Sequence, residues 1–145
     1  MIALRILSKA VLVASTLSAT GAELARDPLP TCFHEASVRY GVDERLLRAI
    51  GKVESNFDPA AVHHDSDGTH DVGVMQVNSS HFDELGQWGI TETVLLTNPC
   101  TNVSVGAWIL AGFIQRHGLT WRAVGSYGAG TSPNKEAARL VSKYE

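Results

Sequence analysis

The sequence predicts a single, mainly helical domain of the α+β class with one small β-hairpin. Its 145 residues are 44% hydrophobic, which is enough for one domain with a sizeable core. Apolar residues recur at helical spacing in several segments that begin at capping residues and end at glycines. Between two of these segments, residues 61–77 combine turn-forming residues with short β-favouring pieces. No repeat, low-complexity run or Gly/Ser linker divides the chain.

The first 22 residues have the features of a cleaved secretory signal. Arg5 and Lys9 give a basic start, residues 10–17 an apolar run, and residues 20–22 a small-residue cleavage site. The run is short for a membrane span, and no Cys follows the cleavage site to carry a lipid. We therefore expect a signal peptide over 1–22, a domain over 23–145 and no stable membrane insertion after cleavage. A short membrane anchor is the less favoured alternative.

Removal of this signal leaves an acidic domain. Arg5 and Lys9 are lost from 12 basic residues, so ten remain against 15 acidic residues, a net charge of −5. This balance argues against nucleic acid or an anionic membrane surface as a partner. A polyanionic substrate would have to be held by local contacts rather than by long-range attraction.

Cys32 and Cys100 are the two cysteines, and both lie in the predicted domain. In an oxidising compartment an even pair of cysteines favours a disulfide, which on closing so long a loop stabilises a fold by roughly 4 kcal/mol. Two free, buried thiols are the alternative, and the export signal disfavours them.

Capping residues and glycines set the limits of the predicted helices. Helices are expected over about 32–40, 43–55, 80–85, 91–96, 98–117, 120–128 and 132–144. Asn98-Pro99 and Ser132-Pro133 each place a proline directly after an N-cap residue. The helix from Asn98 carries the broadest apolar stripe, so we expect it at the centre of the domain. The hairpin over 61–77 then lies beside the helix that ends near Ser55.

Glu54 lies where a carboxylate is poorly accommodated. It follows Leu47 by seven residues and Ile50 by four, so it shares their apolar helix face. It also lies in the last helical turn, where the helix dipole disfavours negative charge. Both effects raise the pKa of the carboxyl group, as a general acid for glycosidic bond cleavage requires. On spacing alone, an exposed Glu at a fraying helix end is the slightly better account, but the motifs around Glu54 favour the acid.

Four motifs follow one another along the chain. They are Glu54-Ser55-Asn56-Phe57, Gly73-Val74-Met75-Gln76-Val77-Asn78, Asn98-Pro99-Cys100-Thr101-Asn102 with Gly106-Ala107-Trp108, and Tyr127-Gly128-Ala129-Gly130. In this series the chain resembles the lytic transglycosylase catalytic domain that is shared with goose-type lysozymes, over about 32–144. It is most similar to the small exported transglycosylases that accompany secretion, conjugation and pilus systems. Each motif alone is modest, but the four together are highly specific.

The resemblance implies a lysozyme-like fold and a periplasmic location. It also implies cleavage of the β-1,4 bond between N-acetylmuramic acid and N-acetylglucosamine in peptidoglycan, with a 1,6-anhydro product. Glu54 matches the single catalytic acid. Implied partners are peptidoglycan strands and components of a secretion, conjugation or pilus apparatus, and no cofactor or metal is implied.

The resemblance implies roles for six further residues. The implied substrate-binding residues are Ser55, Gly73, Met75, Gln76, Asn78 and Tyr127. Ser55 is expected to fix the local backbone or bind the sugar, although capping of its own helical turn is equally favoured. Gly73 allows close backbone approach, and Met75 and Gln76 line the cleft, with Gln76 donating to a glycan oxygen. Tyr127 is expected to form a hydrogen bond near Glu54. On periodicity alone, Met75 and Tyr127 would be core residues.

Two other functions stay open. A muramidase that uses water needs a second carboxylate, for which Asp65, Asp67 and Asp71 are the candidates. The other alternative is a glycan-binding assembly factor with little catalysis. Gly128 supports this alternative. The family commonly has Asn at this position, and the replacement removes a side-chain amide near the cleft.

A cluster of histidines and aspartates in the hairpin raises the question of a metal site. It comprises His63, His64, Asp65, Asp67, His70 and Asp71. No HExxH spacing is present, and the glycine of Asp-x-Asp-Gly comes too early for an EF-hand loop. A polar hairpin tip is therefore the favoured interpretation.

Overall fold

The computed structural model describes residues 28–128. The predicted signal segment and the predicted last helix from Ser132 lie outside the described residues. Within them, α-helices and three short strands surround one core, which confirms the mainly helical α+β class. No described helix is both long enough and apolar enough to cross a membrane.

The helices begin and end close to the predicted residues. The elements are α1 (Leu29–Tyr40), α2 (Glu44–Ser55), β1 (Val62–His64), β2 (His70–Val72), β3 (Val77–Asn78), the 3-10 turn η1 (Ser79–His81), α3 (Phe82–Gly86), α4 (Glu92–Thr97), α5 (Pro99–His117) and α6 (Trp121–Gly128). Side chains of Asp43, Thr91 and Asn98 accept hydrogen bonds from the first turns of α2, α4 and α5, as expected of N-caps. The cap before η1 is Asn78 rather than Ser80.

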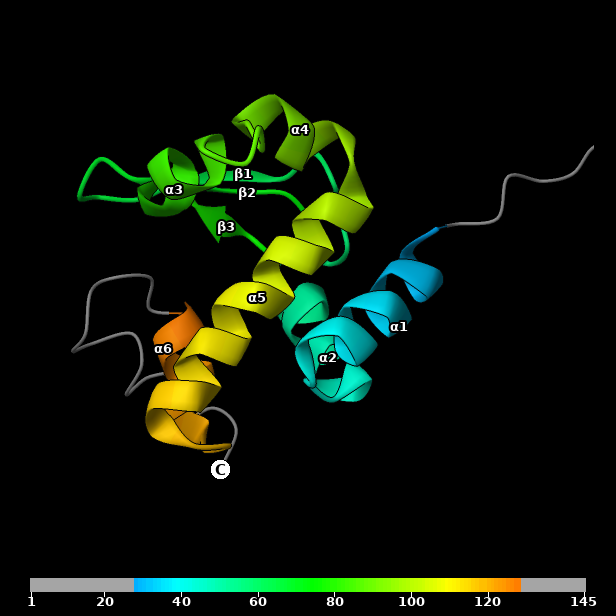
Figure 1. Ribbon diagram of the computed structural model, residues 1–145. Helices are drawn as coiled ribbons and strands as arrows, with labels where there is room; N and C mark the ends of the chain where they lie inside the picture. Colours follow the sequence, from blue (N-terminus) through cyan, green and yellow to red (C-terminus); the bar gives the residue numbers. More distant parts are fainter. Residues whose placement is uncertain (1–27, 129–145) are drawn as a thin grey trace, which may run out of the picture.

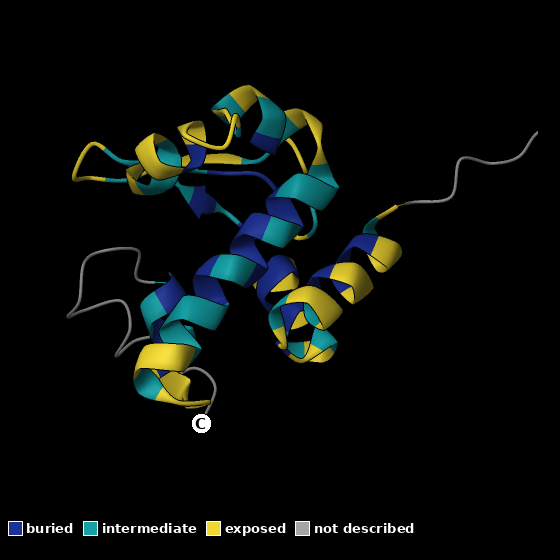
Figure 2. Cartoon of the chain, in the orientation of Figure 1, coloured by how far each residue is buried: buried dark blue, intermediate teal, exposed yellow. Residues whose placement is uncertain are grey.

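Helix α5 is central, as its apolar stripe predicted. Figure 1 shows α5 running between the sheet, α3 and α4 on one side and α1 and α2 on the other. The most extensive helix contacts are those of α5 with α1 and α6. Its inward face is buried along most of its length (Figure 2) and includes Val103, Ala107 and Leu110. Removal of this apolar surface from water is the main stabilising contribution to the fold.

The β element is larger than the predicted hairpin. Strands β1 and β2 pair antiparallel with Val62 opposite Val72, and β3 adds a third antiparallel strand with Val77 opposite Val72. The sequence predicted short β-favouring pieces within 61–77 but no break inside residues 72–77, where β2 ends and β3 begins. The chain reverses between Gly73 and Gln76, which both have positive φ (76° and 48°). A two-residue strand after such a turn has no alternation that sequence periodicity could detect.

The predicted disulfide is confirmed. Cys32 of α1 and Cys100 of α5 are joined, with their Cα atoms 4.9 Å apart. Because the bond closes a loop of 68 residues, it is expected to stabilise the fold by about 4 kcal/mol relative to the reduced chain.

Candidate active site

Glu54 reaches a small pocket from the last turn of α2. Leu47 and Ile50 of the same helix are buried in the core, so the face that they share with Glu54 turns inward, as the spacing predicted. The pocket has a volume of about 30 Å³ and receives residues from the sheet, η1, α5 and α6. It is lined by Glu54, Asp71, Gln76, Asn78, His81, Ile109, Phe113, Tyr127 and Gly128.

The Glu54 carboxyl group holds its proton more tightly than an ordinary glutamate. Burial raises its pKa from 4.5 to about 7, and the negative charge of Asp71 adds to the shift. The raised pKa was predicted, and burial was one of its two predicted causes. The charge of Asp71 is a further cause, which the sequence did not predict. Among residues 28–128, no side chain or backbone group forms a hydrogen bond or ion pair with this carboxyl group. Its proton is therefore available to a ligand in the pocket.

Asp71 is the second carboxylate at this pocket. It lies on β2 opposite Asn78 of β3, and the Asn78 amide donates a 2.9 Å hydrogen bond to it. Burial raises the pKa of Asp71 and the nearby Asp65 adds to this, whereas the hydrogen bond from Asn78 opposes it. Two partly buried carboxyl groups therefore share one pocket, and each disfavours ionisation of the other.

Three helices hold the loop between β2 and β3, which spans residues 73–76. Ser55 of α2 donates a 2.8 Å hydrogen bond to the carbonyl of Val74. Asn102 of α5 accepts a 2.7 Å hydrogen bond from the Met75 N–H. The phenol of Tyr127 in α6 donates to the Met75 carbonyl at 2.7 Å. The loop next to Glu54 is thus fixed by side chains on three separate helices, an arrangement that preorganises the pocket.

Asn102 is the buried centre of this network. It has no exposed surface, and its amide also donates to the carbonyls of Val72 (2.8 Å) and Leu95 (3.3 Å). A buried amide is stable only when its polar atoms have partners, and here both the oxygen and the nitrogen have them. Asn102 therefore ties α5 to β2, to the 73–76 loop and to the end of α4.

Two glycines make these close contacts possible. A Cβ atom on Gly73 would lie 2.2 Å from the Asn102 amide nitrogen, and one on Gly106 would lie 2.6 Å from Cβ of Met75 and 2.8 Å from the Tyr127 hydroxyl. Gly73 also has a φ of 76°, which favours glycine. The close approach expected at Gly73 is present, but the group that approaches is Asn102.

The predicted site residues fall into two sets. Glu54, Gln76, Asn78 and Tyr127 line the pocket, whereas Ser55, Gly73 and Met75 are not among its lining residues. Met75 was expected to line the cleft, but its side chain is fully buried in the core.

Gln76 is bonded differently from what the resemblance suggested, whereas the hydroxyl of Tyr127 forms a hydrogen bond in the loop next to Glu54. The Gln76 amide nitrogen donates to the carbonyls of Gly73 (3.0 Å) and Ala61 (3.3 Å). Both of its donor hydrogens are therefore used, and its oxygen alone is left to contact a ligand. The phenol of Tyr127 donates to Met75, and no hydrogen bond joins it to Glu54 within the described residues.

Sequence reasoning missed several residues of this site. His81, Ile109 and Phe113 line the pocket, and burial lowers the pKa of His81. Asn102 and Gly106 were part of the motifs but received no role. An Asn and a Gly on an otherwise apolar helix face were the available signal, because each interrupts the stripe at a position that turns inward.

The histidine-rich hairpin behaves as a polar surface. His70 pairs with Glu92 of α4 at 3.2 Å, and Asp65 and Asp67 accept hydrogen bonds from Thr69 within the turn. Within residues 28–128, no three side chains of the His, Cys, Asp or Glu type are grouped as a metal site would require.

Known proteins resemble the chain along most of its length. The transglycosylase SLT domain model matches residues 31–145. Invasion protein IagB of Salmonella typhi is 43% identical over 108 residues, which cover 74% of this chain and 68% of the relative. Protein IpgF of Shigella flexneri is 40% identical over 109 residues, or 75% of this chain and 72% of the relative.

The fold has a match among solved structures. An inactive mutant of the lytic transglycosylase Slt from Pseudomonas aeruginosa superposes with a TM-score of 0.56 at 20% identity. The match covers 77% of this chain but only 17% of that much longer chain. At this identity the likeness concerns the fold, and it confirms the predicted lysozyme-like architecture. With the domain match over 31–145 and relatives at 40% identity or more, the chain belongs to the transglycosylase SLT domain family.

Proposed function

We propose that this protein is an exported lytic transglycosylase with Glu54 as its catalytic acid. Its substrate is the β-1,4 bond between N-acetylmuramic acid and N-acetylglucosamine. The observation that carries the proposal is the Glu54 carboxyl group, which has a pKa of about 7 and no protein partner among the described residues. Such a group is protonated in much of the population at neutral pH and can donate to a bound oxygen.

The reaction takes two proton transfers. Glu54 donates its proton to the glycosidic oxygen, the bond from that oxygen to C1 of the muramyl sugar breaks, and positive charge develops at C1. The Glu54 carboxylate then removes the proton from the C6 hydroxyl of the same sugar, and O6 bonds to C1. The products are a 1,6-anhydromuramyl end and an N-acetylglucosamine with a free 4-hydroxyl group, and Glu54 is protonated again.

This route explains why one acid is enough. A hydrolytic glycosidase needs a second carboxylate to activate water or to attack C1. Here the nucleophile is part of the substrate, so it benefits from the high effective concentration of an intramolecular group. The charge of Asp71 would favour the cationic transition state from across the pocket, without a proton transfer of its own.

The position of Asp71 also supports a second candidate, a muramidase that uses water. Of the three carboxylates considered from the sequence, Asp71 is the one that lines the Glu54 pocket. In this reaction Asp71 would activate water or attack C1, and the product would carry a reducing end.

Digestion of purified sacculi in oxygen-18 water separates the two candidates. A transglycosylase releases anhydromuropeptides that are lighter by one water and contain no solvent oxygen at C1. A muramidase releases reducing ends that contain oxygen-18. A parallel digest with Glu54→Gln protein controls for contaminating enzymes. Binding to sacculi with no released muropeptide from either protein would support the assembly-factor alternative instead.

We further propose a role in local wall opening for a secretion, conjugation or pilus apparatus in the periplasm. The similarity to invasion protein IagB supports this role. The Cys32–Cys100 disulfide supports an oxidising compartment outside the cytoplasm. Deletion of the gene is expected to impair assembly of that apparatus, and Glu54→Gln protein is expected not to restore it.

A further inference from the structure

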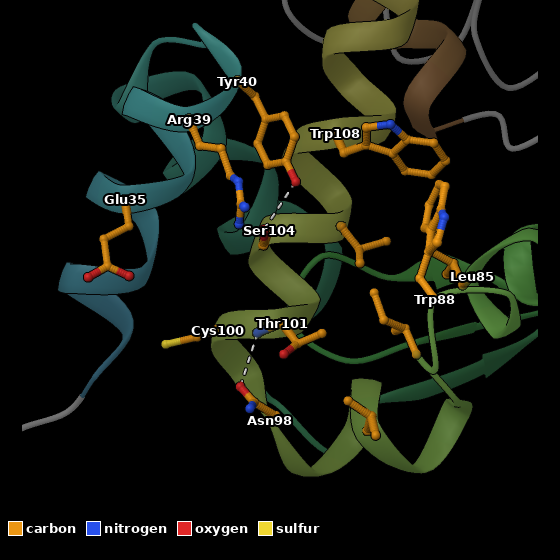
Figure 3. A pocket seen from close by; sticks show the side chains of 13 residues that line it. Glu35, Arg39, Tyr40, Leu85, Trp88, Asn98, Cys100, Thr101, Ser104 and Trp108 are labelled. Atoms are coloured by element: carbon orange, nitrogen blue, oxygen red, sulfur yellow. Dashed lines mark hydrogen bonds between the residues drawn. The ribbon is translucent and has the colours of Figure 1, made fainter.

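A second and larger pocket lies on another face of α5. Its volume is about 610 Å³, within the range of small-molecule sites, and it opens between α1, α5 and the segment from α3 to α4. Figure 3 shows α1 on one side, α5 behind, and Trp88 and Trp108 on the other side. It shares no lining residue with the Glu54 pocket. The His81 ring, which lines the Glu54 pocket, packs edge-on against Trp108 at 6.2 Å, so the two pockets are neighbours.

Aromatic rings form the walls of this second pocket. Trp88 and Trp108 meet at 85° with their ring centroids 5.4 Å apart, and the Tyr40 ring faces them across the opening (Figure 3). Trp88 is 57% exposed and follows the end of α3, where its N–H donates a 3.0 Å hydrogen bond to the Leu85 carbonyl. The face of an indole carries partial negative charge and attracts the polarised C–H bonds of one face of a sugar ring.

Hydroxyl groups and an unpaired cation supply the polar contacts. Thr101 and Ser104 lie on the floor of the pocket, and the Ser104 hydroxyl is 3.4 Å from that of Tyr40. The Arg39 guanidinium lies in the opening, about 6.0 Å from the Tyr40 ring. Within residues 28–128 no carboxylate pairs with Arg39, although Glu35 is one helical turn away on the same helix. Figure 3 shows the Glu35 carboxylate directed away from Arg39.

The combination selects an amphipathic, anionic ligand. The tryptophan pair fits the apolar face of a sugar, the hydroxyls fit its hydroxyl and acetamido groups, and Arg39 fits a carboxylate. In a domain with an acidic net charge, a cation left unpaired in a pocket is a local contact for an acidic ligand. A neutral sugar would leave Arg39 without a partner.

We propose that this pocket is a second peptidoglycan-binding site, which takes a disaccharide with its sugars against Trp88 and Trp108 and a stem-peptide carboxylate on Arg39. The proposal rests on the proposed function for the identity of the polymer. A second contact with the same insoluble polymer keeps the enzyme on the wall between cleavage events, because it raises the effective concentration of glycan at the Glu54 pocket.

The test uses the disaccharide-tetrapeptide GlcNAc–MurNAc-peptide, which lacks the bond that the enzyme is proposed to cleave. Binding is therefore read independently of activity. The chain has three tryptophans, so titration into the wild-type protein is followed by the indole N–H signals in NMR spectra. The Trp88 and Trp108 signals are expected to move, whereas that of Trp121 is expected to stay. Neutral chitobiose is the matched probe without a carboxylate.

Variants then assign the contacts. Trp88→Ala and Arg39→Gln are each expected to weaken the affinity for the disaccharide-tetrapeptide by about tenfold. Trp121→Ala removes an exposed tryptophan outside the pocket, and Arg45→Gln removes an exposed arginine of α2. Both controls are expected to leave the Kd within about twofold. Circular dichroism and Tm verify that every variant is folded.

Three results would overturn the proposal. One is a Trp88 signal that stays fixed at saturating muropeptide. Another is unchanged affinity in Arg39→Gln protein, and the third is chitobiose binding at Trp88 as tight as that of the muropeptide. These binding measurements do not depend on cleavage, so they can be made even if the protein has no wall-lytic activity. Failure of this proposal is therefore distinguishable from failure of the proposed function.

Discussion

The phenol of Tyr127 donates a 2.7 Å hydrogen bond to the carbonyl oxygen of Met75, which precedes it by 52 residues. Burial and the negative charges of Glu54 and Asp71 raise the pKa of Tyr127 well above its usual value, so the phenol keeps its proton at neutral pH. The resemblance had suggested a hydrogen bond of this hydroxyl near Glu54. In the structure it fixes α6 to the 73–76 loop, while burial and Asp71 set the pKa of Glu54.

Replacement of the proposed catalytic acid gives the first prediction. Glu54→Gln is expected to lower the release of soluble muropeptides by about two to four orders of magnitude, because an amide cannot donate the proton. The rate is measured on purified sacculi by chromatography. The variant should bind sacculi as well as the wild type does, and wild-type-like release would falsify the assignment of Glu54.

The same substitution should stabilise the protein at high pH. A folded-state pKa of about 7, above the usual 4.5, disfavours folding once the carboxyl group ionises. The wild type therefore loses stability as the pH rises from about 4.5 to about 7, by up to about 3 kcal/mol from this group, and the loss levels off above pH 7. Urea unfolding at pH 4 and pH 8 tests this point. The two proteins should be similarly stable at pH 4, and the variant more stable at pH 8. An equal gap at both values would contradict the raised pKa.

Asp71→Asn tests whether Asp71 acts only by raising the pKa of Glu54 or takes part in the reaction itself. Wild-type activity should fall as the pH rises through about 7, because Glu54 loses its proton. Removal of the Asp71 charge lowers the pKa of Glu54, so this fall should move to lower pH while activity persists below it. Activity is measured against pH on sacculi, with Asp67→Asn at the exposed hairpin tip as the control. Loss of activity at every pH would instead favour the muramidase mechanism.

Asn102→Ala should be strongly destabilising. It leaves the Met75 N–H and the Val72 and Leu95 carbonyls without their buried partner, at a cost of about 2–4 kcal/mol in the free energy of unfolding. Asn98→Ala removes a hydrogen bond from the same helix, but an exposed N-cap costs only about 1 kcal/mol. Urea unfolding of the oxidised proteins compares them, and equal losses would refute a special role for Asn102.

Two glycines of α5 give a matched pair. Gly106→Ala places a Cβ against Met75 and Tyr127, so it should cost about 1–3 kcal/mol and reduce activity. Gly112→Ala meets only the flexible end of Arg116, at 3.6 Å, and should stabilise the helix by up to about 1 kcal/mol. Thermal unfolding measures both changes. If Gly106→Ala stabilised the protein as Gly112→Ala is expected to do, the contacts of Gly106 with Met75 and Tyr127 would relax more easily than the geometry implies.

Local sequence signals predicted the helices well. The caps at Asp43, Thr91 and Asn98 and the glycine at position 41 mark helix limits through contacts within a few residues, which a sequence displays directly. The spacing to Leu47 and Ile50 placed Glu54 on their apolar helix face, but the surrounding motifs were needed to favour a buried acid over an exposed helix end. The disulfide followed from the cysteine count and the predicted export.

Long-range contacts were beyond such reasoning. The partners of Asn102 lie up to 30 residues away, and those of Tyr127 lie 52 residues away. The sequence offered Asp65, Asp67 and Asp71 as a second carboxylate but did not single out Asp71, since that depends on the pairing of β2 with the two-residue β3. The tryptophan-lined pocket likewise joins α1 to residues beyond the sheet. In each case the fold, rather than the adjacent sequence, decides which side chains meet.

The disulfide would hold the protein together after a proteolytic cut in the hairpin between β1 and β2. The exposed residues 66–68 at the tip between β1 and β2 offer a cutting site, and Cys32 and Cys100 lie on opposite sides of it along the chain. After a single cut there, both fragments stay covalently joined. A nicked molecule therefore migrates as one species on a non-reducing gel and as two after reduction, and Glu54 and Tyr127 remain parts of one particle.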